Sequence, residues 1–436
     1  PDHFINMYRN WLEEDKVRDW CISRQLWWGQ RIPAYYYEDH FFVAETAEEA
    51  LAEAKAKTGK EDLTIADLRQ DEDVMDTWFS SWLWPISVFD GFENQDELKY
   101  YYPTNVLVTG WDIMYLWVAR MIMAGYEWSE DLLGKEFVEK NGRQPFQDVY
   151  FTGMVRDAQR RKMSKQLGNS PSALNLIDTY GADGVRFGML SSGSAGNDIV
   201  FDAPIDPKTK QAVDESKLCA QGSQFCNKIW NAARYVLMNT EEHNCGQNNE
   251  AFELSLADKW IISRLQQTEA AIEKHVADFR LDLASHALYE FIWNEYCDWY
   301  LELSKPILTS NQSSDALKLG TRRTLVRVLE AVLRLAHPFI PYITEEIWQR
   351  IAPLAGKSGD TIMNQAYPVK DDSKIDTLAL GDVEWLKGVI LAIRNIRGEM
   401  DISPAKAIPV FLREGNAEDK RRFEENASFI SSLAKL

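Results

Sequence analysis

The stretch 160–170 brings two lysines, a hydroxyl and a glycine together in one polar segment. It reads Arg-Arg-Lys-Met-Ser-Lys-Gln-Leu-Gly-Asn-Ser, and its chemistry lies in Lys162, Ser164 and Lys165. The apolar run 149–155 before it predicts a buried strand. Ammonium and backbone N–H groups at a strand end can neutralise the charge that moves during phosphoryl or nucleotidyl transfer. We therefore expect a polyphosphate-binding loop, although short basic clusters are more often solvated turns.

A second candidate site follows the short buried strand expected at 105–109. Gly110 and Asp112 come directly after it, and an apolar helix is expected over 113–123. A strand, a glycine turn and a helix make a parallel α/β unit, whose ligands bind beyond the carboxyl ends of the strands. The strand at 149–155 is expected to continue this sheet. Asp112 could accept hydrogen bonds from ribose hydroxyls or cap the following helix.

Aromatic side chains mark the segments before this unit. Trp27 and Trp28 lie in a segment without a clean period, and we expect them to pack as a core pair beside a surface arginine. Farther along, an acidic turn leads into an aromatic helix start, with Asp76 or Thr77 as its N-cap. The Ala/Glu/Lys-rich stretch 44–67 predicts one or two surface helices.

The composition is that of a globular chain of two or three domains. The 436 residues include 45% hydrophobic residues and carry a net charge of −19. This charge argues against a protein that coats nucleic acid indiscriminately, because such binding depends on many phosphate contacts. A local basic track on the acidic body is compatible with it.

The cysteines and the apolar runs bear on the compartment. The five cysteines form no Cys-x-x-Cys pair and no cluster with zinc spacing. We therefore expect reduced thiols, a cytoplasmic protein and no tightly bound metal. No apolar run is long enough to cross a membrane, so no membrane partner is expected.

Helical periods dominate the second half of the chain. They predict an all-α bundle of about five helices. The expected helices are 225–238, 257–279, 283–303, 322–337 and 344–351. After the bundle, a small helix–strand–helix unit is expected, with Ile408–Leu412 as its strand. Both ends of the chain fall in mid-pattern and look cut from a longer protein.

The ordered motifs resemble those of one enzyme family. Residues 162–165 are similar to the second signature of the class I aminoacyl-tRNA synthetases. Other segments resemble the valine enzymes of that class: 19–29, 73–81, 109–113, 180–187, 337–348, 394–400 and 402–406. The resemblance covers essentially the whole chain in the expected order.

The resemblance implies an α/β region followed by an all-α region. The expected domains are the second half of a Rossmann-like catalytic domain at 1–170, a stem-contact or linker region at 171–217, a helical anticodon-binding domain at 218–370 and a truncated appended unit at 371–436. Valine is favoured over isoleucine and leucine by the double tryptophan, by Gly-Trp-Asp-Ile after the 105–109 strand and by the Arg-Asn-Ile-Arg segment.

The activity implied by the resemblance is a two-step ligation. Valine and ATP form valyl-adenylate with release of pyrophosphate, and valine then moves to the terminal ribose of its tRNA. Lys162 and Lys165 would neutralise the departing phosphates, Ser164 would donate to them, and Mg²⁺ would arrive with ATP as substrate. The ATP contacts carried over to this chain are Gly110, Asp112, Met154, Val155, Lys162, Met163, Ser164 and Lys165.

The amino-acid pocket implied by the resemblance is aromatic. Its candidates are Trp28, Val74 and Trp78, with Asp76 to hold the substrate ammonium or to act as an N-cap. A dry aromatic wall suits a branched aliphatic side chain but cannot strongly reject threonine, so editing is expected.

The helical bundle resembles an anticodon-binding domain. The tRNA-binding candidates are Asn227, Lys228, Asn231 and Arg234. RNA loops are read by stacking and by base-edge hydrogen bonds. For the neighbouring Trp230 we favour a place in the bundle core. The expected partners are valine tRNA, valine and ATP, and we expect a monomer.

Two departures from the family pattern shape the expectation. None of the six histidines forms a His-x-Gly-His signature, and Gln166 stands where serine is usual. In full-length relatives the first half of the nucleotide fold and the editing insertion come earlier, so this chain alone is expected not to form valyl-adenylate. Two alternatives stay open: a stand-alone tRNA-binding module descended from a synthetase, and an isoleucine- or leucine-specific enzyme.

Overall fold

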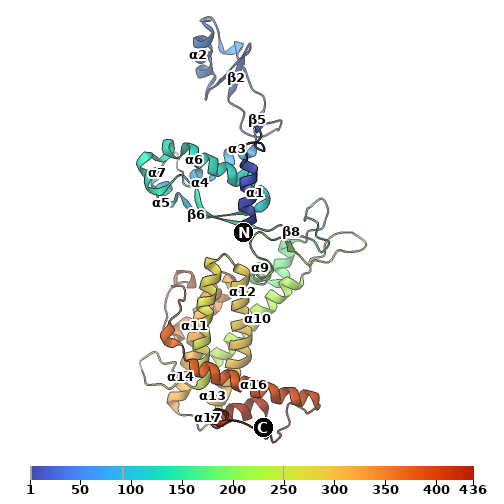
Figure 1. Cartoon of the computed structure of the whole chain (residues 1–436), viewed down its shortest axis with the longest axis vertical. Helices are drawn as coiled ribbons and strands as arrows, with labels where there is room; N and C mark the ends of the chain where they lie inside the picture. Colours follow the sequence, from blue (N-terminus) through green and yellow to red (C-terminus); the bar gives the residue numbers. More distant parts are fainter. Residues whose placement is uncertain (1, 91–92, 249) are drawn as a thin grey trace. The chain divides into compact units, whose positions relative to one another are not determined.

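A computed structural model describes residues 2–90, 93–248 and 250–436. The chain divides into two compact units, 1–153 and 154–436. Figure 1 draws the first in blue to teal and the second in green to red. Throughout the described ranges, no helix has the length and apolar character needed to span a bilayer.

The first unit contains a parallel strand–helix–strand unit. β6 (Thr104–Gly110) pairs in parallel with β7 (Phe146–Thr152), and α6 (Ala119–Leu133) and α7 (Lys135–Asn141) lie between them in the chain. This confirms the parallel α/β prediction, but β6 is not fully buried: Val106 is 41% and Val108 is 60% exposed. Val106 and Val108 point to the same face of this sheet, because side chains alternate along a strand, and that face is open at both positions.

The rest of the first unit is built from short elements. β2, β3 and β4 form a small antiparallel sheet against α2, and β1 pairs with β5. The bounds are α1 Asp2–Leu12, β1 Ser23–Arg24, β2 Ala34–Tyr37, β3 His40–Val43, α2 Ala47–Thr58, β4 Arg69–Gln70, β5 Val74–Met75, α3 Thr77–Ser81, α4 Trp84–Ser87 and α5 Gln95–Tyr101. The surface helix expected in 44–67 is confirmed as α2.

The second unit opens with a short α/β segment and continues as a helical bundle. Its elements are β8 Val155–Arg156, α8 Ala173–Tyr180, α9 Ala182–Ser191, β9 Ile199–Val200, α10 Lys217–Thr240, α11 Leu256–Ala277, α12 Leu281–Tyr289, α13 Leu301–Thr309, α14 Asp315–Ala336, α15 Pro341–Leu354, α16 Thr377–Glu399 and α17 Ala417–Ala434. A π-helical stretch joins α12 to α13, so the predicted helix 283–303 is longer and continuous. The other predicted bundle helices are confirmed: 225–238 and 344–351 lie within longer helices, whereas 257–279 and 322–337 start inside theirs and extend two residues and one residue past the observed ends.

The bundle core explains this helical pattern. Trp260, Trp348, Tyr296 and Tyr300 are almost completely buried in it. Asp258 is buried among them and accepts hydrogen bonds from the Tyr300 hydroxyl at 2.6 Å and the Thr321 hydroxyl at 2.9 Å. These bonds replace the water that the carboxylate loses on folding.

The strand expected at Ile408–Leu412 is wrong. The segment between α16 and α17 has no regular structure. Pro409 has no N–H to give to a ladder, and the backbone bond from Ile408 N to Lys435 O, 3.3 Å long, joins the segment to a helix end instead of a strand.

Candidate functional site

The basic loop at 160–170 belongs to a tight hairpin that starts at β8. We call residues 155–169 the lysine hairpin. Arg156 and Lys162 form an antiparallel bridge, and Met163 N donates to Val155 O over 3.3 Å. The Met163 and Val155 side chains pack against a buried cluster that includes Leu176 and Phe201. Lys162 and Lys165 are exposed, whereas Met163 is half-buried and Asn169 is buried, so the hairpin keeps one side inward and its lysines at the surface.

A buried pair of polar residues holds the two arms of the hairpin. Asn169 Nδ2 donates to Asp157 Oδ2 over 2.9 Å and to Lys162 O over 3.2 Å, and Asn169 Oδ1 accepts from Ser164 N over 2.9 Å. Asp157 and Asn169 are each 1% exposed. The positions of Lys162 and Ser164 therefore depend on one asparagine side chain.

Asp157 stays ionised in this buried setting. The hydrogen bond from Asn169, those from Arg161 and the charge of the Arg161 guanidinium lower the pKa of Asp157 to about 2, although burial acts to raise it. Its Oδ1 also accepts the backbone N–H of Gln159, which makes an Asx turn. The sequence analysis missed Asp157, and an aspartate followed by a short polar turn was the signal that could have found it.

The residues just before the hairpin are joined to β9. Asp198 accepts Met154 N over 2.9 Å and forms an ion pair of 2.5 Å with Arg156. Val155 pairs in parallel with Ile199. Met154 and Val155, expected beside adenine, thus have a fixed backbone in the same unit as the lysine hairpin.

In the first unit, Asp112 folds back over Gly110. A Cβ placed on Gly110 would lie 2.6 Å from Asp112 Oδ1, so the carboxylate packs directly against the glycine backbone. Asp112 is exposed in a short 3₁₀ turn, and a π-helical stretch leads from it into α6. Gly110 and Asp112, both expected to contact ATP, therefore lie next to each other at the end of β6.

Asp76 caps α3 and accepts three side-chain and backbone donors. Its Oδ1 accepts Trp78 N over 3.1 Å, and its Oδ2 accepts Trp20 Nε1 over 2.9 Å and Arg24 Nη2 over 2.6 Å. Burial acts to raise the pKa of Asp76, but these hydrogen bonds and the Arg24 charge outweigh it and leave the pKa below its ordinary value. The N-cap prediction is confirmed, and any substrate ammonium would have to share this carboxylate with Arg24.

The predicted pocket residue Val74 packs against Gly29, which directly follows the predicted pocket residue Trp28. A Cβ on Gly29 would lie 2.9 Å from the Val74 side chain. Val74 is buried, Trp78 is half-buried, and Trp28 is 86% exposed. The expectation that Trp27 and Trp28 form a core pair is wrong, because both side chains are exposed, Trp27 to 96%.

The four predicted tRNA-binding residues lie on α10 in the second unit. Three of them are exposed, and the fourth, Lys228, is held in an ion pair. Asn227, Asn231 and Arg234 are exposed on one face of the helix. Trp230 lies on the same face, because the four residues follow the helical spacing i, i+3, i+4 and i+7. Trp230 is 44% exposed, so its assignment to the core is wrong. Lys228 instead forms an ion pair of 2.7 Å with Asp298 and lies 4.8 Å from the centre of the Trp293 ring.

Two segments distant in sequence join at the base of α15. The Asp183 carboxylate accepts Tyr342 N over 3.3 Å and Ile343 N over 2.7 Å, and so caps this helix from α9. The Arg186 guanidinium donates to the carbonyls of Pro338 and Phe339 over 3.0 and 3.2 Å. A hollow of about 410 Å³ beside this junction is lined by Trp230 and by Tyr342, which is 69% exposed.

The structure shows no preformed metal site in the ranges it describes, since no three His, Cys, Asp or Glu side chains cluster there as ligands would. A magnesium ion that arrives with a phosphate substrate needs only one or two protein carboxylates, because the phosphates and water supply its other ligands.

Comparison with known families matches both parts of the chain. Residues 1–202 match the family described as tRNA synthetases class I (I, L, M and V). Residues 258–412 match the anticodon-binding domain of tRNA ligase. The order of the two regions agrees with the sequence prediction.

Solved structures share this fold at low sequence identity. The ternary complex of Agrobacterium radiobacter K84 agnB2 LeuRS with tRNA and LeuAMS aligns with a TM-score of 0.60 and 20% identity over 83% of this chain and 43% of that one. Methionyl-tRNA synthetase of Mycobacterium tuberculosis aligns with a TM-score of 0.52 and 17% identity in its methionyl-adenylate complex, over 83% of this chain and 61% of that one. Its apo form gives 0.51 and 14%, over 85% and 62%.

The chain spans less than two thirds of the length of these structures. Its matched regions nevertheless account for both of its structural parts. The chain therefore consists of a partial, Rossmann-like catalytic region of the class I aminoacyl-tRNA synthetases of the I, L, M and V group, followed by a helical anticodon-binding domain.

Proposed function

We propose that this chain is part of a valine–tRNA ligase that activates valine with ATP and transfers it to valine tRNA. The observation that carries the proposal is the hairpin of Lys162, Ser164 and Lys165: Asn169 binds the backbone of Lys162 and Ser164, and both lysines lie at the surface. Activation of an amino acid releases pyrophosphate, and fixed cations stabilise the charge that develops on that leaving group.

The proposed first step is an in-line displacement. The valine carboxylate oxygen attacks the α-phosphorus of ATP, the bond from that phosphorus to the bridging oxygen breaks, and the electron pair leaves with magnesium pyrophosphate. Lys165 and Lys162 interact with the β- and γ-phosphates, and Ser164 donates to them. Met154 and Val155 border the adenine in the second unit. In the first unit, Asp112 binds the ribose, with Gly110 beside it.

The proposed choice of valine rests on the segments that resemble valine enzymes and on the exposed tryptophans Trp27 and Trp28. Trp28, Val74 and Trp78 would surround the branched side chain, and the Asp76 carboxylate, which is already paired with Arg24, would hold the ammonium group. Shape alone discriminates weakly between similar side chains, by about 1–3 kcal/mol per methylene. Threonine is therefore the expected misactivated substrate.

The second half of the proposed reaction needs tRNA. Asn227, Trp230, Asn231 and Arg234 offer an amide, an aromatic ring and a guanidinium on one face of α10, which is the combination that RNA loops bind. Lys228 is a weaker candidate because Asp298 already neutralises it.

Amino-acid-dependent ATP–pyrophosphate exchange by the full-length protein tests this proposal. Valine is expected to drive exchange, threonine to do so weakly, and isoleucine and leucine to be poor substrates. Lys165→Ala should lower the rate about 10²–10³-fold, while Lys208→Ala, an exposed lysine outside the hairpin, should leave it unchanged. Exchange driven by isoleucine or leucine instead would overturn the valine assignment, and a normal rate in Lys165→Ala would overturn the role of the hairpin.

A further inference from the structure

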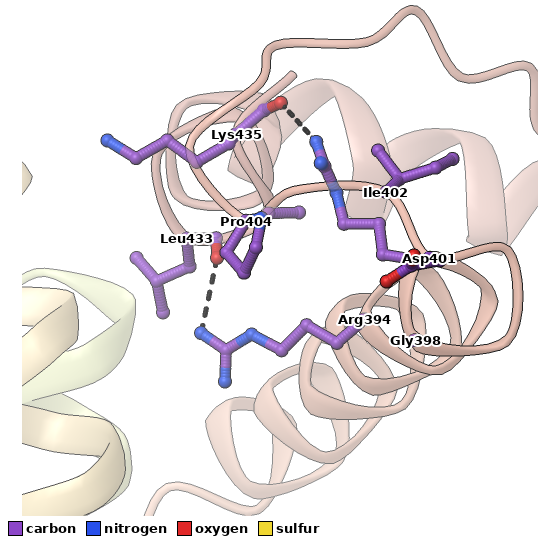
Figure 2. Close-up of a pocket in the computed structure, with 9 residues that line it drawn as sticks. Arg394, Gly398, Asp401, Ile402, Pro404, Leu433 and Lys435 are labelled. Atoms are coloured by element: carbon purple, nitrogen blue, oxygen red, sulfur yellow. Dashed lines mark hydrogen bonds between the residues drawn. The ribbon is translucent and has the colours of Figure 1, made fainter.

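A pocket of about 390 Å³ lies where the end of α16 meets the end of α17 (Figure 2). Its charged lining residues are Arg394, Arg397, Lys435 and a single carboxylate, Asp401. This positive excess stands out in a chain with a net charge of −19. A local basic site on an acidic protein attracts an anion to one defined place.

Arg397 is the buried base of this pocket. It is 5% exposed and donates to Lys435 O over 2.7 Å and to Ser403 O over 3.1 Å. Its Nε is buried without a hydrogen-bond partner. Carbonyl oxygens satisfy two of its donors but bring no full negative charge, and in the described part of the chain no carboxylate forms an ion pair with it.

Arg394 is the accessible cation of the pocket. It is exposed and donates to Leu433 O over 3.2 Å, drawn as a dashed line in Figure 2. Its guanidinium also lies 5.6 Å from the centre of the Trp299 ring, which limits its orientations. A guanidinium has five N–H donors, so most of those on Arg394 remain for a ligand.

The two arginines have a local structural role, because they bind carbonyls at a helix end. One hydrogen bond from each would fulfil that role. A buried guanidinium with an unused Nε, on Arg397, and a cavity lined by both arginines and Lys435 exceed what capping requires. An oxyanion would supply the missing charge and would accept the unused donors.

We propose that this pocket binds a phosphate group of an RNA backbone, with Arg394 as its main contact and Arg397 as its buried electrostatic support. The RNA part rests on the proposed tRNA-dependent function, whereas the phosphate chemistry rests on the pocket alone. Phosphate is preferred over a carboxylate ligand because two guanidinium groups line the cavity, and their planar donors match the oxygens of a phosphate.

The test measures RNA affinity and phosphate stabilisation in parallel. A valine tRNA transcript is titrated with the chain at several salt concentrations, and the melting temperature is measured in phosphate and in chloride of equal ionic strength. Arg394→Gln is expected to weaken RNA binding about three- to tenfold and to reduce the slope of log K against log salt by about 0.9. Phosphate should raise the melting temperature of the unchanged chain but not that of Arg394→Gln.

Two controls keep these outcomes distinct. Arg394→Lys should retain most of the RNA affinity, and Lys357→Gln, an exposed lysine elsewhere in the unit, should leave it unchanged. If the unchanged chain binds tRNA but Arg394→Gln binds equally well with the same salt slope, the pocket proposal is overturned and the function proposal stands. If the chain does not bind tRNA, the proposed function loses its RNA partner, and an equal melting temperature in phosphate and chloride then overturns the pocket as well.

Discussion

Asn169 and Asp157, twelve residues apart, are joined by a hydrogen bond of 2.9 Å from Nδ2 to Oδ2 in the interior of the lysine hairpin. The same asparagine also binds the backbone at Lys162 and Ser164. One amide therefore holds the two arms together and fixes the backbone from which the lysines project. The first prediction concerns this residue.

Asn169→Ala should open the hairpin. It removes three hydrogen bonds and leaves the buried Asp157 carboxylate with an unused acceptor, at a local cost of about 1–3 kcal/mol. Limited trypsin digestion should cut the chain after Lys162 or Lys165 several-fold faster than in the unchanged protein. Asn141→Ala is the control, because its exposed amide binds the Phe137 carbonyl within α7, in the other unit of the chain. Equal cleavage rates for both variants would contradict the role of Asn169.

Gly222→Ala should separate α9 from α10. A Cβ on Gly222 would lie 2.1 Å from the carbonyl oxygen of Gly184, which leaves no room for a methyl group. We expect a loss of about 1–3 kcal/mol in the free energy of unfolding, measured by urea titration. Gly388→Ala in α16 is the matched control, since its Cβ would meet open space and should stabilise the helix by about 0.5–1 kcal/mol.

Asp183→Ala should weaken the start of α15. It removes the acceptor of Tyr342 N and Ile343 N and should lower the free energy of unfolding by about 1–2 kcal/mol. Asp183→Asn keeps one acceptor oxygen and should lose less. The two variants are compared by thermal melting followed by circular dichroism. A loss that is equal for both would show that charge, and not capping, is what Asp183 contributes.

Glu269 should make stability depend on pH. Burial raises its pKa to about 7, although the charges of Lys374 and Arg334 oppose the shift, and Asp371 acts in the same direction as burial. Because the folded pKa lies above the unfolded one, the folded state holds a proton that the unfolded chain loses. Stability should therefore be highest near pH 4.5 and fall as the pH rises to about 7, by on the order of 3 kcal/mol.

Glu269→Gln isolates this effect. The variant should lose little at pH 5 and should be more stable than the unchanged chain at pH 8, when both are compared by urea unfolding. Glu273→Gln, an exposed change on the same helix, should show the same difference from the unchanged chain at both pH values. A pH profile that Glu269→Gln leaves unaltered would rule out Glu269 as the titrating group.

The sequence by itself determined which segments form helices and which form strands, and it determined the cationic character of the loop at 160–170. The parallel pairing of β6 with β7, the bundle helices and the Asp76 cap all follow from short-range patterns, and each is confirmed. Periodicity and capping act within a few residues, which is why they can be recognised without the fold.

Tertiary structure decided the contacts that join distant positions. Periodicity could not reveal that Asn169 would lock Asp157, that Asp183 would cap α15 from 159 residues away, or that Arg24 would share the Asp76 carboxylate. Nor could it show which tryptophans face outward. Trp28 and Trp230 are exposed while Trp260 is buried, because burial depends on which surfaces pack together after the chain has folded.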